Sequence, residues 1–207
     1  EKTFLVRDIR VTGVAKGLED LNEPVVPADV SPEDAKPVAD FSYLPENRVL
    51  TLADGIGGVL GDSMVTSGDL AVSMSMADGK AWLNYERNNT NWNGGIYVDL
   101  LNAAAKGKAV TDWTGAEIFW FYAQTEADTY INVAAAVDNE YSGEVQGYFN
   151  SEAAGLKYYV EEDGAFVEKA TTEDTWKHIF LPAGYDGWVG FDLSQMVCRS
   201  GHLTEQD

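Results

Sequence analysis

Two groups of aromatic and polar residues have the chemistry needed to hold a neutral sugar. A sugar ring presents apolar C–H faces that stack on flat aromatic rings, and hydroxyl groups that bond to amide, imidazole or guanidinium groups. The first predicted group of ligand-binding residues consists of Tyr130, Asn132, His178 and Trp188. The second lies in an Asn-rich segment and consists of Trp82, Tyr85, Arg87 and Trp92.

The Asn-rich segment, residues 81–95, also has a purely structural interpretation. Asn and Gly favour turn geometry, and a tryptophan at such a turn can cap a hydrophobic core. The residues alone leave both interpretations open.

Catalysis of glycoside hydrolysis is the competing chemistry, and it needs two carboxyl groups about 5–10 Å apart. The candidates are Glu86, Glu117 and Glu126, but no pattern places two of them on one face beside a tryptophan. The histidines, His178 and His202, have no partner at a zinc-ligand spacing. No nucleophile elbow or phosphate loop is present. We therefore predict that the protein is not an enzyme.

The charge of the chain limits its partners. Its 207 residues carry a formal net charge of −20, which argues against nucleic acid and against anionic membrane surfaces.

Aromatic residues make up 12% of the chain, more than a core of this size needs, so some should be exposed. A single cysteine, Cys198, excludes an internal disulfide. A strongly acidic, soluble surface suits a neutral ligand, a bound cation or a protein that works outside the cell.

Turn signals recur every 8–12 residues from Val38 onward, with short runs of β-branched and aromatic residues between them. This spacing is typical of an all-β protein, and we expect an antiparallel two-sheet β-sandwich of jelly-roll type. One short helix is expected near residues 100–107. The predicted strands are 40–43, 48–53, 70–76, 80–87, 95–99, 116–123, 129–137, 156–160, 165–168, 176–181 and 187–193.

Alternation within the strands predicts which side chains face outward. In the last two strands the predicted core residues are Ile179, Leu181, Val189, Phe191 and Leu193. The opposite parity places Trp176, His178, Trp188 and Asp192 outward. In the strand at 129–137, Ile131 and Val133 face the core, which turns Tyr130 and Asn132 outward.

Three segments are expected along the chain. Residues 1–13 alternate as a strand that belongs to the sandwich or to a preceding module. Residues 14–37 contain four prolines and are expected to form a linker or surface excursion without regular sheet pairing. Residues 38–207 form the sandwich. We expect the chain to be part of a larger multidomain polypeptide.

Two sequence motifs resemble those of a known family. The first is Asp112-Trp113-Thr114-Gly115 followed by Ile118-Phe119-Trp120, and the second is the closing segment Trp176 to Val189 with Pro182-Ala183-Gly184 and Gly187-Trp188. In this order they resemble bacterial carbohydrate-binding modules of the galactose-binding-like jelly-roll type. Such modules are attached to glycoside hydrolases that degrade plant polysaccharides such as cellulose. The resemblance covers roughly residues 38–197.

The resemblance implies several further properties. It favours Ile118, Trp120 and Tyr122 as the inward residues of their strand. Residues 4–13 look like the family's last strand, so we predict that residues 3–11 pair within the sandwich. Related modules often hold a structural calcium, for which Asp40 and Asp192 would be the carboxylate ligands here. In these modules the motif of the last strand usually contains an aspartate at its first acidic position. This chain has Arg7 there, so it departs from the common calcium site.

The function implied is non-catalytic binding of a neutral plant polysaccharide, of the β-glucan, mannan or xyloglucan type. Such a module would target an extracellular enzyme or a cell-surface protein to that polysaccharide. The alternative is a structural or interaction β-sandwich domain of a bacterial surface protein, without glycan binding. The chain's extra aromatic residues would then fill the sandwich and its contacts with other domains.

Overall fold

The computed structural model describes residues 2–12, 31–33, 35–45, 48–49, 56–60, 63–65, 70–77, 80–87, 94–113, 115–138, 145–150, 154–195 and 197–198. The described chain is mostly β-strand in antiparallel sheets, with one short α-helix, α1 (Leu100–Ala104), which confirms the predicted all-β class. Two 3₁₀ turns, η2 (Phe41–Tyr43) and η4 (Leu193–Gln195), complete it. In these residues no helix has the length and apolar character of a membrane span.

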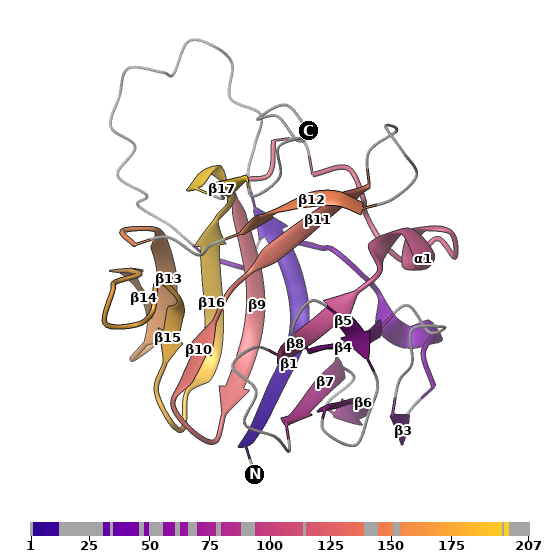
Figure 1. Cartoon of the computed structure of the whole chain (residues 1–207), viewed down its shortest axis with the longest axis horizontal. Helices are drawn as coiled ribbons and strands as arrows, with labels where there is room; N and C mark the ends of the chain where they lie inside the picture. Colours follow the sequence, from indigo (N-terminus) through magenta and orange to yellow (C-terminus); the bar gives the residue numbers. More distant parts are fainter. Residues whose placement is uncertain are drawn as a thin grey trace.

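A nine-stranded sheet forms the back of the molecule in Figure 1. Its strands, in spatial order, are β14 (Ala165–Ala170), β13 (Lys157–Glu162), β16 (Asp186–Asp192), β9 (Ile118–Thr125), β1 (Lys2–Thr12), β7 (Lys80–Arg87), β6 (Leu70–Ala77) and β3 (Arg48–Val49). The strand predicted at the N-terminus is therefore present as β1 and pairs with both β7 and β9. The ninth strand, β2 (Lys36–Pro37), pairs with β1, so the end of the Pro-rich segment joins the sheet, contrary to expectation.

Three smaller antiparallel sheets accompany the large one. They are β5 (Ser63–Val65), β4 (Ile56–Leu60) and β8 (Gly94–Val98); β10 (Thr129–Ile131) and β15 (Ile179–Leu181); and β11 (Ala134–Asp138), β12 (Val145–Asn150) and β17 (Val197–Cys198). Figure 1 shows β10, β15 and β11 in front of β9 and β16. The side chains between these layers form the main core.

The main core is built from alternate residues of strands on both sides. The four apolar residues of β15 and β16 with the predicted inward parity, Ile179, Leu181, Val189 and Phe191, are all 0% exposed, as expected. Full burial of such a side chain contributes about 1.5–3 kcal/mol each. From β9 and β13 the main core receives Phe121, Ala123, Tyr158 and Val160. Leu193 differs from expectation, because it begins η4 and is half-buried.

The inward residues expected for β9 were assigned to the wrong face. Phe121 and Ala123 enter the main core, whereas Trp120 is buried on the other face, in a second cluster with Ala35 and Tyr159. The strand is apolar at every position from Ile118 to Tyr122 because this part of the sheet is covered on both faces. Alternation cannot choose the core face of such a strand.

Several predicted strands have different ends. Residues 41–43 form η2 because the Asp40 side chain accepts a hydrogen bond from the Ser42 backbone and caps the turn. The strand expected at 129–137 is divided between β10 and β11, which belong to different sheets. The strand expected at 176–181 begins only at Ile179. Strands β4, β5, β12 and β17 were not predicted.

Candidate functional site

Three aromatic rings gather on the outer side of the β10–β15 pair, and we call them the aromatic shelf: Tyr130, Trp176 and Phe180. Tyr130 and Phe180 are direct cross-strand partners, with ring centroids 5.2 Å apart. Trp176 lies against Tyr130, with centroids 4.6 Å apart. Trp176 is 66% exposed and Tyr130 39%, so both offer ring surface to solvent. Among the large hydrophobic side chains that the structure describes, Trp176 is the most exposed.

The backbone that presents Trp176 is strained. Trp176 and Lys177 both have positive φ, 49° and 63°, a left-handed conformation that costs a non-glycine residue about 1–2 kcal/mol. Two such residues in succession persist only where the surrounding structure holds them in place. Strain of this kind is found most often at functional sites.

Hydrogen bonds within residues 172–178 hold this turn. The backbone N–H of Trp176 donates to Glu173 O at 3.0 Å, and that of Lys177 donates to Thr172 O at 2.8 Å. The Thr175 hydroxyl bonds to the carbonyl oxygens of Thr172 at 3.1 Å and His178 at 2.9 Å. His178 contacts the carbonyl oxygen of Trp176 through Nδ1. His178 therefore supports the shelf from behind the tryptophan.

The strands below the shelf fix its other two rings. Ile179 and Leu181, on either side of Phe180, are 0% exposed, so alternation turns Phe180 outward. The turn after β15 is tied to the turn before β10 because Ala183 N donates to Asp128 Oδ1 at 2.9 Å. Tyr130 and Phe180 are thus carried by paired strands, of which β15 has two fully buried residues.

The residues near Trp176 include hydroxyl, amide and imidazole groups as well as charged side chains. Thr172 is exposed, while Thr175, His178 and Asn132 are half-buried. The one nearby cation on the turn, Lys177, lies 3.7 Å from Glu173, and Asp174 is exposed beside them. Hydroxyl, amide and imidazole groups exchange hydrogen bonds with neutral hydroxyl ligands.

The structure separates the first predicted group. Tyr130 and His178 belong to the shelf and its supporting turn, but Trp188 does not. Its ring packs edge-on against Tyr122, at 5.5 Å and 82°, on the rear face of the nine-stranded sheet. Both Trp188 and His178 precede core residues, as expected, but β15 and β16 lie in different sheets. Trp188 packs against the second cluster, so the structure does not bring it together with Tyr130 and His178.

In the second predicted group, Trp82 is the aromatic residue whose side chain the structure describes, and it is buried. Trp82 is only 7% exposed and packs edge-on against Tyr122, with centroids 6.1 Å apart. Tyr85 and Arg87 lie in β7, where only their backbone pairing is described. Trp92 lies outside the described residues.

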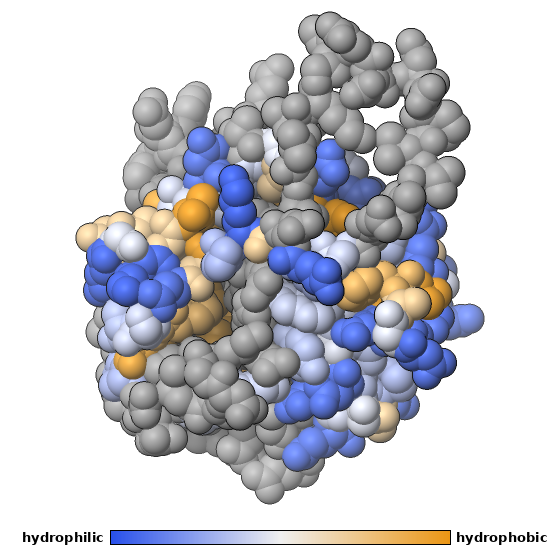
Figure 2. All heavy atoms as spheres, turned by 180° about the vertical axis from the view of Figure 1, so that it is seen from behind, coloured by the Kyte–Doolittle hydropathy of each residue, from blue (hydrophilic) through white to orange (hydrophobic). Residues whose placement is uncertain are grey.

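The rear face is a mixed surface. The Tyr122 hydroxyl donates to Asp186 at 2.7 Å, and the Trp188 backbone donates to Glu161 at 3.2 Å. Figure 2, which views the molecule from this side, shows hydrophilic residues interspersed with apolar patches, one of them at the β13–β14 end of the sheet. The exposed aromatic geometry of the shelf belongs to the opposite side.

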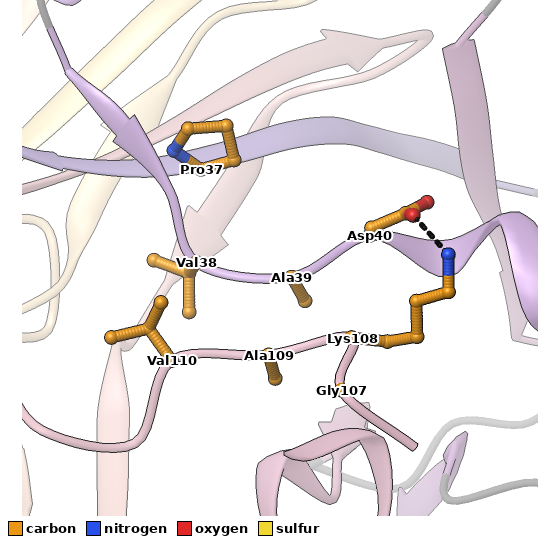
Figure 3. Close-up of a pocket in the computed structure, with 8 residues that line it drawn as sticks. All are labelled: Pro37, Val38, Ala39, Asp40, Gly107, Lys108, Ala109 and Val110. Carbon is orange, nitrogen blue, oxygen red and sulfur yellow. Dashed lines mark hydrogen bonds and ion pairs between the residues drawn. The ribbon is translucent and has the colours of Figure 1, made fainter.

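Asp40, one of the two predicted calcium ligands, lies in a pocket of about 200 Å³. The pocket lies between residues 37–40 and 107–110, and Figure 3 shows the Asp40 and Lys108 side chains reaching toward each other at one end. Lys108 Nζ lies 2.7 Å from Asp40 Oδ2. This bond from Lys108 and those from Ser42 lower the pKa of Asp40 to about 2. The Asp40 carboxylate is thus already engaged in an ion pair with Lys108 and in the cap of η2.

Asp40→Asn tests this ion pair, because asparagine keeps the cap on η2 and removes only the charge. The folded-state pKa of Asp40 is depressed, so its contribution to stability is present above the unfolded value of 3.8 and is lost as the pH falls toward about 2. Asp40 and Lys108 side chains are 55% and 35% exposed, so we expect the variant to lose less than about 1 kcal/mol at neutral pH. Urea unfolding at several pH values should show this difference vanish in acid; a constant difference would contradict the assignment.

Asp192, the second predicted calcium ligand, accepts hydrogen bonds from the Ser194 backbone at 2.9 Å and hydroxyl at 2.6 Å. In the part of the chain that the structure describes, no three His, Cys, Asp or Glu side chains are grouped in a way that could hold a metal ion. The calcium prediction stays a prediction.

Two members of the shelf were absent from the predicted ligand-binding groups. Trp176 faces outward, as expected, but lies in a turn before β15 and not within the expected strand, and Phe180 belongs to neither predicted group. The useful signal was the polar run Thr171-Thr172-Glu173-Asp174-Thr175 that ends in a single tryptophan. A large aromatic residue that follows five polar ones has little core of its own to enter.

Comparisons with family models, curated proteins and solved structures found no match to this chain.

Proposed function

We propose that this protein is a non-catalytic carbohydrate-binding module and that the aromatic shelf is its binding site. The ligand is a neutral plant-type polysaccharide of the β-glucan, mannan or xyloglucan class. One observation carries the proposal: a tryptophan ring that is 66% exposed is held against an exposed tyrosine by a strained turn. An apolar ring left in water by a costly backbone conformation favours a role in recognition.

The chemistry of the shelf supports a sugar as the ligand. The apolar face of a pyranose ring would cover indole surface, which excludes water from both. The exposed Thr172, on the same turn as Trp176, would supply its hydroxyl for a hydrogen bond to a sugar hydroxyl group. Because the rings already occupy fixed positions, binding would cost little ordering of the protein.

The charge distribution supports a neutral sugar. The chain carries a net charge of −20, and Glu173 and Asp174 flank the shelf on its own turn. A polysaccharide with many carboxylate groups would meet like charge at this site.

We also propose that the four sheets together form a two-layer sandwich of jelly-roll type, with the nine-stranded sheet as one layer. The main core, which joins β9, β13 and β16 to β15 and β10, supports this arrangement. In such a sandwich, β1 is an internal strand of the domain. A rigid two-layer scaffold would place the shelf on the side opposite Trp188.

The proposed role is targeting. Attached to an extracellular enzyme or a cell-surface protein, the module would keep its partner at high effective concentration near the polysaccharide. Reaction chemistry would then belong to the attached domain.

Native affinity gel electrophoresis tests the proposal. The whole chain should migrate more slowly in gels that contain at least one of a soluble β-glucan, a mannan and a xyloglucan, and Trp176→Ala should remove this retardation. Leu101→Ala is the matched control, because Leu101 is also an exposed apolar side chain, 56% exposed, but lies in α1. The control should migrate like the unchanged protein.

The alternative function is a structural or interaction domain. Exposed Leu101 and Val110, at 56% and 48%, are the observation that favours it. Absence of retardation on all three polysaccharides would overturn the carbohydrate-binding proposal and favour this alternative. Equal retardation of the unchanged protein and Trp176→Ala would remove the shelf as the site.

A further inference from the structure

The rings of the shelf do not lie in one plane. The planes of Tyr130 and Trp176 meet at 62°, and those of Tyr130 and Phe180 at 40°. A flat crystalline polysaccharide surface presents many sugar rings in one plane, and it needs coplanar aromatic rings to cover it. The shelf lacks that geometry.

The shelf instead forms a corner. The centroids of Tyr130 and Trp176 are 4.6 Å apart, so the edge of one ring lies on the other. Two successive sugar rings cannot stack flat on two aromatic rings that touch in this way, because a sugar ring is about as wide as an aromatic ring. One sugar ring can lie on the exposed face of Trp176 with the tyrosine beside it.

We propose that the shelf binds one sugar unit of a single hydrated polysaccharide chain, or of a chain end or side branch, and does not bind crystalline polysaccharide surfaces. This inference rests on the proposed function and names the physical form of its ligand. The backbone N–H of Lys177 and the Thr175 hydroxyl both donate to Thr172 O, which holds the turn that carries Trp176. A single sugar unit engages few groups, so the affinity is modest and depends on one ring.

Two experiments on the whole chain test the inference. In the first, the chain is mixed with microcrystalline cellulose and, separately, run in gels of soluble β-glucan, mannan and xyloglucan. At least one soluble polymer should retard the chain in the gel. Microcrystalline cellulose should not remove the chain from solution through any binding that depends on Trp176. In the second, glucose, mannose, xylose, cellotetraose and mannotetraose compete for the retarding polymer. The monosaccharide that matches it should compete within about 10-fold of the best tetrasaccharide.

The results separate the inference about the form of the ligand from the proposed function on which it rests. Depletion by microcrystalline cellulose that Trp176→Ala removes would overturn the inference, while the carbohydrate-binding proposal would stand. Competition by a tetrasaccharide but by none of the three monosaccharides would show an extended site and overturn the single-unit inference in the same way. Failure to bind any polysaccharide, soluble or crystalline, would overturn the proposed function itself. Leu101→Ala serves as the control in both experiments.

Discussion

Replacement of Gly190 with alanine should lower the free energy of unfolding by about 1–3 kcal/mol or more. A Cβ atom at this position would lie 2.5 Å from Trp120 Cζ3 and 2.7 Å from Cη2. Trp120 is 0% exposed and has no space to retreat, since its ring packs against Phe166 at 5.1 Å and Tyr159 at 6.3 Å. Either the indole leaves its position or β9 and β16 move apart.

Urea denaturation of the unchanged protein and two variants measures this effect. Gly155→Ala is the control for a Cβ added where there is space, because a Cβ there would meet nothing within 4 Å, although Gly155, unlike Gly190, has a positive φ of 83°. The control should lose about 1 kcal/mol, because alanine is strained at a positive φ. Trp120→Leu in the Gly190→Ala background should recover part of the loss, because the clash is removed. A loss at Gly190 no larger than that of the control would contradict the packing described for the second cluster.

Trp176→Ala should weaken binding of the retarding polysaccharide by about 30-fold or more. Truncation of an aromatic anchor at the centre of a binding site costs about 2 kcal/mol or more, which is this change in affinity. Its effect on stability should be within about 0.5 kcal/mol, since the side chain is 66% exposed. Trp176→Phe should keep an intermediate affinity, because a smaller ring still offers a flat apolar face.

Isothermal titration calorimetry gives the affinities, and urea denaturation shows that the variants are folded. Tyr130→Ala should also weaken binding, and its effect should not add to that of Trp176→Ala, because the two rings touch. A Trp176→Ala protein that is folded and binds as tightly as the unchanged protein would contradict the account.

The core of the C-terminal region could be predicted from alternation alone. Ile179 and Leu181 share one parity in β15, as Val189 and Phe191 do in β16, and all four are 0% exposed, as this parity predicts. Parity says nothing about which sheet a strand joins. For this reason Trp188 and His178 were both correctly separated from the core residues beside them, but were wrongly placed on one face.

Other parts of the site depend on features that alternation cannot express. The exposure of Trp176 follows from two left-handed residues, and neither Trp nor Lys signals that conformation as glycine would. Trp120 is buried on the rear face because Gly190 leaves room for its indole across the strand pair. Strand β4 was missed because Gly57 and Gly58 suggest a turn, although their backbone pairs with β8.

The most direct test of the central claim is fluorine NMR of the chain labelled with 5-fluorotryptophan. The six tryptophans give separate resonances, and Trp176→Phe identifies the one from the shelf. During titration with the retarding polysaccharide, the account predicts that the Trp176 resonance shifts saturably and that Trp120, buried in the second cluster, does not respond. A saturable shift of another tryptophan with no change at Trp176 would contradict it.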